Sequence, residues 1–127
     1  MEAACEATKA LGLTEVGLFG TRFTMQGRFY AKEFSKHGIA LAVPDADEQA
    51  YIHEKYMGEL VHGVFLPETR ERMLGIVDRL KATERIQGLI LGGTELPLIL
   101  RDPEGRGIPF LDTTRIHVAR AVAQLLS

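Results

Sequence analysis

The chain of 127 residues is long enough for one domain with a hydrophobic core and too short for two domains of ordinary size. Its 15 lysine and arginine residues nearly balance its 17 aspartate and glutamate residues, and both signs are interspersed, which makes nucleic acid and anionic membranes poor partners. No apolar run approaches the length of a membrane span, and the amino end lacks a secretory pattern, so we expect a cytoplasmic protein.

Four short apolar segments bounded by turn-forming residues are typical of strands buried in a parallel sheet. In chain order they cover residues 15–19, 39–43, 89–91 and 108–111. Pro109 lies within the last of them. Because proline cannot donate a hydrogen bond to a central ladder, we expect this strand at an edge of the sheet.

Amphipathic segments before, between and after these strands predict helices. They cover residues 2–11, 24–37 and 45–61, a stretch that starts at 64–67, and 113–125. The expected caps are Thr24, Asp45 and Asp112. The last helix is expected to face inward with Ile116, Ala119, Val122 and Leu125.

The alternation of strands and helices predicts an α/β fold, a four-stranded parallel sheet flanked by helices with right-handed crossovers. No repeat, linker or low-complexity segment interrupts it, so residues 1–127 are expected to form a single domain. Polar clusters follow every strand, and the carboxyl ends of parallel strands are where such sheets hold ligands. They are residues 21–24, Asp45, 93–95 and 112–114.

The corner after the third strand, Gly92-Gly93-Thr94-Glu95, is the most distinctive of these clusters. Backbone amides in a glycine turn are not shielded by side chains and suit an anion such as a substrate carboxylate. The other interpretation is that the polar residues at the strand ends are helix caps, which would account for Thr24, Asp45 and Asp112.

Several of these segments also form an ordered set of family motifs. The matching residues are 17–25 with Phe29 and Tyr30, 43–45, Glu59, Leu60 and Gly63, 91–95, and 111–114 with 117–119. Together they resemble the carboxyl-terminal half of the aspartate/glutamate racemases, the pyridoxal-independent amino-acid racemases. The resemblance implies one of two similar α/β domains that face each other across a cleft, and no cofactor.

In that family one thiol lies on each side of the substrate's α-carbon, so that a planar carbanion is reprotonated from either face. The first thiol belongs to a Cys-Asn-Thr motif that is absent here, and the second to Gly-Cys-Thr-Glu, in which Gly93 occupies the cysteine position. A missing acid or base typically costs about 10² to 10⁴ in rate. The chain therefore lacks both catalytic cysteines, and we expect little or no racemisation by it alone.

The resemblance also implies residues that hold a small amino acid of the aspartate or glutamate class. Thr94 and its neighbouring amides would hold the carboxylate or the amine, and Thr21 and Thr24 would line the same cleft. Thr94 could also cap the helix that begins at Glu95, which is expected to stabilise that helix rather than act as a base. Arg22 could meet a distal carboxylate or lie on the solvated surface.

The remaining reactive residues have simpler interpretations. Cys5, the only cysteine, is expected to be a small buried hydrophobe, which excludes a disulfide within the chain. Some family members carry a lysine where Val61 or His62 stands, so the preference for aspartate or glutamate stays open. No two of the four histidines have metal-ligand helical spacing, and the acidic residues 45, 47 and 48 lack the other elements of a calcium loop, so no metal is expected.

Two functional hypotheses follow. The first is the second half of a racemase, encoded separately or truncated, whose amino-terminal half-domain is missing. The second is a non-catalytic amino-acid-binding or self-associating module, in which two copies form a homodimer that imitates the two domains. A receiver-like signalling domain is a weaker third hypothesis, since the paired acids of a phosphoacceptor pocket do not follow the first strand.

Overall fold

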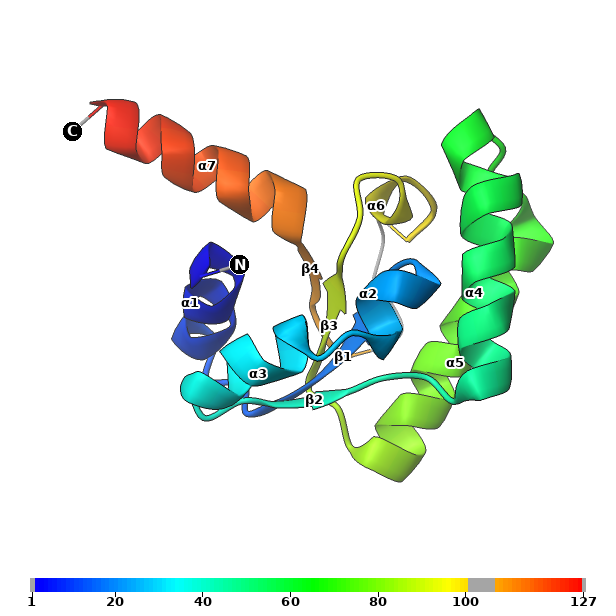
Figure 1. Cartoon of the computed structure of the whole chain (residues 1–127), viewed down its shortest axis with the longest axis horizontal. Coiled ribbons are helices and arrows are strands. Elements are labelled where there is room, and N and C mark those ends of the chain that lie inside the picture. Colours follow the sequence, from blue (N-terminus) through cyan, green and yellow to red (C-terminus); the bar gives the residue numbers. More distant parts are fainter. Residues whose placement is uncertain (1, 101–106, 127) are drawn as a thin grey trace.

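A computed structural model describes residues 2–100 and 107–126, so most of the polar loop expected at 101–107 lies outside the described residues. Four parallel strands form one sheet in the order β2-β1-β3-β4 (Figure 1). They are β1 Glu15–Phe19, β2 Ala40–Ala42, β3 Gly88–Leu91 and β4 Phe110–Asp112. The α/β prediction is confirmed, and β4 lies at an edge as predicted, although it begins at Phe110 and Pro109 precedes it instead of lying within it.

Helices cover both faces of this sheet. They are α1 Glu2–Ala10, α2 Arg22–Gln26, α3 Phe29–Lys36, α4 Ala46–Gly58, the short 3₁₀ helix η1 Leu60–His62, α5 Pro67–Glu84, α6 Leu96–Ile99 and α7 Thr113–Leu126. In Figure 1, α1 and α3 lie on one side of the strands and α4 and α5 on the other. None of the helices along the described residues has the length and apolar character to cross a membrane.

The side chains of successive strand residues alternate between two apolar clusters. Leu18 and Ile90 pack with Phe34 of α3 and Cys5 of α1, while Phe19 and Leu89 belong to the cluster that α4, α5 and α6 cover. Cys5 is fully buried, which confirms that it is a small core residue. Apolar side chains thus fill both faces of the sheet along the described residues, while its strand ends carry polar groups.

The second predicted helix is in fact two, because the chain is extended at Gly27 between α2 and α3. The prediction of Thr24 as the cap is wrong, because the observed cap of α2 is Thr21, three residues earlier. Thr21 adopts the extended backbone of a cap, and the Thr24 amide donates to the Thr21 hydroxyl at 3.4 Å. The cap is the residue closest to the strand end, since α2 begins immediately after the Gly20 turn.

Asp45 and Asp112 are the caps that the sequence indicates: Glu48 N donates to Asp45 Oδ1 at 2.9 Å, and Arg115 N donates to Asp112 Oδ1 at 3.0 Å. The predicted inward face of the last helix is wrong beyond its first turns. Ile116 is partly buried, but Ala119 is exposed, and 47% of Val122 and 85% of Leu125 are exposed. The reason is geometric, because α7 runs outward past the sheet (Figure 1).

Candidate functional site

Two glycines bring the ends of β1 and β3 together. Gly92 N donates to the Phe19 carbonyl at 2.8 Å. A Cβ added at Gly20 would lie 2.8 Å from the methyl carbon and 2.9 Å from the Cβ of Thr24, and one added at Gly92 would lie 3.2 Å from the Phe19 carbonyl oxygen. Neither Gly92 nor Gly93 has a left-handed backbone, so close packing rather than backbone conformation favours a small residue at position 92.

The corner that follows β3 holds a carboxylate between two hydroxyl groups. Thr94 Oγ1 and the phenol oxygen of Tyr56, which comes from α4, both donate to Glu95 Oε1 at 2.6 Å. These two hydrogen bonds, the one from Thr94 first, lower the pKa of Glu95. Burial first, and then the hydrogen bond to Glu95, raise the pKa of Tyr56 to about 12. Near neutral pH the pair is therefore an ionised carboxylate and a neutral phenol.

The helix-cap interpretation of Thr94 is wrong, because the cap position lies one residue further along the chain. Glu95 itself occupies the cap position of α6, and no side-chain hydrogen bond caps that helix. α6 has only four residues, so its dipole offers little to an acid or to a ligand. The hydroxyl of Thr94 and the carboxylate of Glu95 are engaged with each other and with Tyr56 instead.

Gly93, the predicted cysteine position, lies against the same phenol. A Cβ added to it would lie 2.2 Å from the Tyr56 hydroxyl oxygen and 3.0 Å from Cε2 and Cζ of the ring. Tyr56 is almost fully buried, and sequence reasoning missed it because it follows Ile52 at helical spacing and resembles a core residue. The signal that could have found it is its hydroxyl, since a buried tyrosine needs a hydrogen-bond partner.

The predicted binding residues Thr21 and Thr24 lie at the same corner. Their hydroxyl oxygens are 3.3 Å apart, and the Thr24 methyl lies at both Gly20 and Gly92. The Arg22 side chain is exposed, while its backbone N donates to Nδ1 of His53 at 2.9 Å. At the end of β4, the Thr113 hydroxyl donates to the Leu91 carbonyl at 3.0 Å. The ends of β1, β3 and β4 thus gather polar groups around the strand ends.

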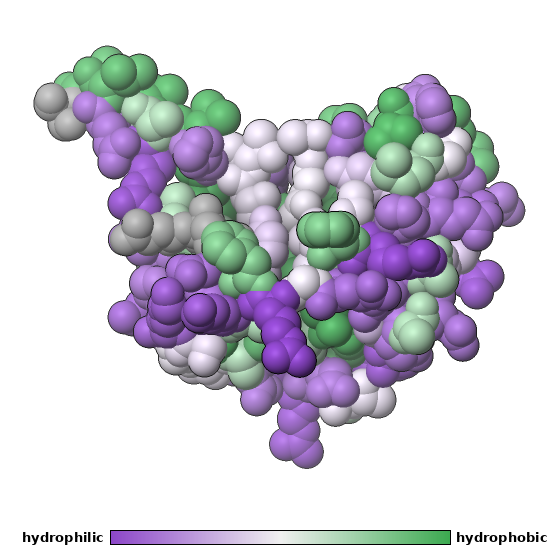
Figure 2. All heavy atoms as spheres, in the orientation of Figure 1, coloured by the Kyte–Doolittle hydropathy of each residue, from purple (hydrophilic) through white to green (hydrophobic). Residues whose placement is uncertain are grey.

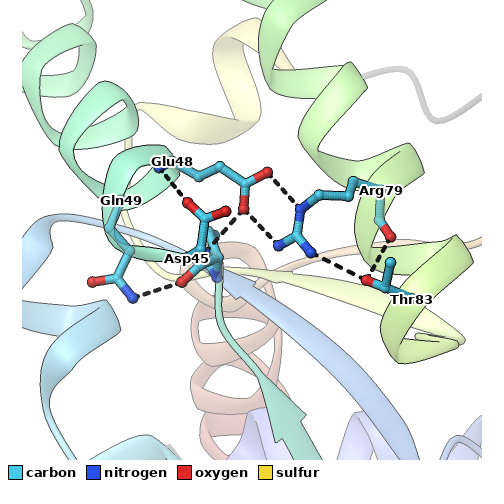
Figure 3. Close-up of polar contacts among 6 residues, drawn as sticks. Asp45, Glu48, Gln49, Arg79 and Thr83 are labelled. Carbon is cyan, nitrogen blue, oxygen red and sulfur yellow. Dashed lines mark hydrogen bonds and ion pairs between the residues drawn. The ribbon is translucent and has the colours of Figure 1, made fainter.

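Asp45, by contrast, belongs to a structural network at the start of α4 (Figure 3). Asp45 and Glu48 form a reciprocal capping box, in which Asp45 N donates to Glu48 Oε1 at 2.9 Å. The Arg79 guanidinium on α5 donates to both oxygens of Glu48, with its Nε 2.6 Å from Oε2. This two-pronged contact joins the start of α4 to α5, and α4 is the helix whose His53 and Tyr56 reach the corner.

Apolar surface lies on both sides of the strand ends. Figure 2 shows it along the outer part of α7 at the upper left and near the ends of α4 and α5 at the upper right, with a hollow between them. The exposed apolar residues of α7 are Val118, Val122, Leu125 and Leu126, and those near α4 and α5 include Met57, Val61 and Phe65. Within residues 2–100 and 107–126, no three histidine, cysteine, aspartate or glutamate side chains come together to hold a metal ion.

The chain has the α/β fold of a parallel sheet flanked by helices, with hydroxyl groups and a carboxylate at its strand ends, the edge at which sheets of this class commonly hold ligands. The sequence profile of one family, described as Asp/Glu/Hydantoin racemase, matches residues 1–121. The chain belongs to this family.

Solved structures place the chain within the racemase architecture. The chain is 30% identical to a putative Asp/Glu racemase from Yersinia pestis, with a TM-score of 0.88. This match covers 99% of the present chain and 54% of the Yersinia pestis chain. The chain is 28% identical to an aspartate racemase homologue from Pyrococcus horikoshii OT3, with a TM-score of 0.90 and the same coverage. The chain therefore spans about half the length of these proteins and matches one domain of their fold.

A curated relative is also similar over most of the chain. An uncharacterized protein in the pnlA 3' region of Pectobacterium carotovorum subsp. carotovorum is 29% identical over 129 residues, which cover 96% of this chain and 80% of that protein. The predicted family, the α/β fold and the half-length match are thus confirmed. The roles of individual site residues stay predictions.

Proposed function

We propose that this chain is a non-racemising binding half-site: it binds a small amino acid of the aspartate or glutamate class at the corner of β1 and β3, and alone it does not racemise that ligand. The observation that carries this proposal is the absence of a thiol at Gly93, where a phenol fills the space instead. The resemblance assigns three threonines to binding: Thr21 and Thr24 follow β1 with their hydroxyl oxygens 3.3 Å apart, and Thr94 follows the neighbouring strand β3.

Amide spectra recorded during a titration with L- and D-aspartate and L- and D-glutamate test this proposal. We expect saturable shifts at residues 21–24 and 92–95, and about fivefold to tenfold weaker binding by Thr94→Val, because one hydrogen bond of the corner is lost. Thr83→Val is the matched control. Thr83 lies near the end of α5, which precedes the amino end of β3, whereas the corner follows the carboxyl end of that strand. Shifts spread evenly over the surface, or an equal loss in both variants, would contradict the proposal.

We propose assembly as a second function, which one specific observation favours: 85% of Leu125 and 83% of Leu126 are exposed on α7. An apolar hollow of about 510 Å³ lies beside this helix and is lined by Ala7, Leu11, Phe110, Ile116 and Ala119, among others. Exposed apolar surface of this kind favours association. A second copy of the chain, or a half-domain like the other half of the racemase structures, would cover it.

Sedimentation velocity over a range of concentrations tests assembly. We expect reversible association of the unmodified chain and its loss in the double variant L125E/L126E, whose melting temperature should not change because both side chains already contact water. Lys32→Glu on the exposed surface of α3 changes the net charge by the same amount and serves as the control. If the unmodified chain sediments as a monomer at every concentration, self-association is contradicted.

A further inference from the structure

We propose that Tyr56 takes the place of the missing cysteine side chain: its phenol fills the space beside Gly93 and, with Glu95 and Thr94, forms a hydrogen-bond acceptor site for the ammonium group of an amino-acid ligand. This inference rests on the proposed binding function and names the part of the ligand that the corner recognises. It concerns a residue that lies outside the family motifs in the sequence.

The Tyr56 phenol fills the space that a side chain at position 93 would need. A Cβ on residue 93 would lie 2.2 Å from the Tyr56 oxygen and 3.0 Å from two ring carbons, so the tyrosine or the backbone at 93 must shift, and a shift of the phenol disturbs its hydrogen bond to Glu95. The backbone at Gly93 is not in the left-handed region, so an alanine or cysteine there would be acceptable in conformation. The three atoms nearest to such a Cβ all belong to Tyr56. Positions 56 and 93 are therefore coupled, and a large residue at one requires the smallest at the other.

The hydroxyl hydrogens of Tyr56 and Thr94 are already used in hydrogen bonds within the corner. Tyr56 and Thr94 each have one, and both donate it to Glu95 Oε1. What these three side chains can still offer a ligand is lone pairs and one negative charge. Such a group suits a cation that donates hydrogen bonds, and it repels a carboxylate. Of the two ligand groups considered for this corner, the carboxylate and the amine, these side chains favour the amine. A carboxylate of the ligand would instead bind the exposed guanidinium of Arg22.

The same arrangement makes Tyr56 a poor replacement for a catalytic thiol. If the phenol gave its proton to a substrate carbanion, the O–H bond would break, a C–H bond would form, and a phenolate would remain beside the ionised Glu95. Two adjacent negative charges are strongly unfavourable. Reversing this step requires the phenolate to exist first, at the same cost. Tyr56 is accordingly a binding residue that fills the site without exchanging the α-proton.

A cycle of variants tests the steric argument without any ligand. Gly93→Ala should lower the melting temperature by about 5 °C or more in the unmodified protein, and by less than about 2 °C in a Tyr56→Leu background, because leucine keeps the apolar contacts and removes the ring. Should Tyr56→Leu not fold, Tyr56→Phe replaces it, and partial relief is expected since the ring carbons remain. Equal effects of Gly93→Ala in all backgrounds would overturn the proposal.

A ligand pair tests the ammonium site. L-Aspartate and succinate have the same carboxylates and differ in the ammonium group. We expect L-aspartate to bind at least about tenfold tighter, and Glu95→Gln to remove that preference. Equal binding of the two would overturn the ammonium assignment and leave the binding function standing. If neither binds, the proposed function fails and the ammonium site with it, whereas the melting temperatures still decide where Tyr56 lies.

Discussion

Replacing Gly20 with alanine is expected to lower the free energy of unfolding by about 2–3 kcal/mol. The added Cβ would meet the Thr24 side chain at 2.8 and 2.9 Å, and one of those two atoms is the Thr24 Cβ, which cannot rotate away. The neighbouring Gly92 carbonyl oxygen, 3.4 Å distant, leaves no room on the other side. Either α2 or the end of β1 must shift. Urea denaturation followed by circular dichroism measures the loss.

Gly75→Ala is the matched control for this substitution. A Cβ at Gly75, in the interior of α5, would meet nothing within 4 Å, so the variant should be more stable by about 0.5–1 kcal/mol through helix propensity. Thr24→Ser removes the methyl group at 2.8 Å but keeps the Cβ, and it should recover part of the loss when combined with Gly20→Ala. If Gly20→Ala is as stable as the unmodified chain, the close packing of this corner is incorrectly described.

The second large effect is expected from Glu48→Ala, at about 2 kcal/mol of unfolding free energy. The substitution removes one half of the capping box, worth about 1 kcal/mol, and the two-pronged hydrogen bond from Arg79. The contribution of Arg79 is discounted because 35% of its side chain is exposed. Since Glu48 anchors the helix that carries Tyr56, amide shifts should extend along α4 to the corner. Thermal unfolding together with amide spectra measures both effects.

Two further variants separate charge from general disturbance of α4. Glu54→Ala removes an exposed acid from the same helix and should change stability by less than about 0.5 kcal/mol. Glu48→Gln keeps an oxygen for the Asp45 amide and loses the charge, so its effect should lie between the other two. Equal stabilities of Glu48→Ala and Glu54→Ala would show that the network of Figure 3 contributes nothing.

The four strands were predictable because apolar runs bounded by turn residues define buried parallel strands locally. Asp45 and Asp112 were predictable as caps for the same reason, since a cap depends on a few adjacent residues. Thr24 was assigned wrongly because two threonines three residues apart both satisfy the cap pattern. Only the position of the strand end decides in favour of Thr21.

The long-range features were not predictable from the residues alone. Tyr56 and Glu95 are 39 residues apart, and Glu48 and Arg79 are 31 apart, so no local pattern joins them. The inward face of α7 was misjudged because periodicity shows that a helix is amphipathic but not what covers its apolar side. Leu125 has the spacing of a core residue but lies in solvent, since the sheet ends before the helix does.

The position of Tyr56 also decides how a thiol at position 93 should be tested. Gly93→Cys alone would place a side chain on the phenol oxygen and disturb the corner, so its inactivity would not show that the pocket is otherwise damaged. Gly93→Cys combined with Tyr56→Leu supplies the thiol and the space for it. Only this double variant is a fair test of whether a single thiol on this wall suffices for α-proton exchange.

The most direct measurement is exchange of the α-proton of L- and D-aspartate and glutamate in deuterium oxide, followed by proton NMR. With the unmodified chain, we expect no exchange above the rate in buffer, because residue 93 has no side chain and, among the described residues of this corner, the Tyr56 phenol and the Glu95 carboxylate are hydrogen-bonded to each other. Exchange by the unmodified chain would contradict this account, since it would require a base that the Tyr56–Glu95 pair does not provide.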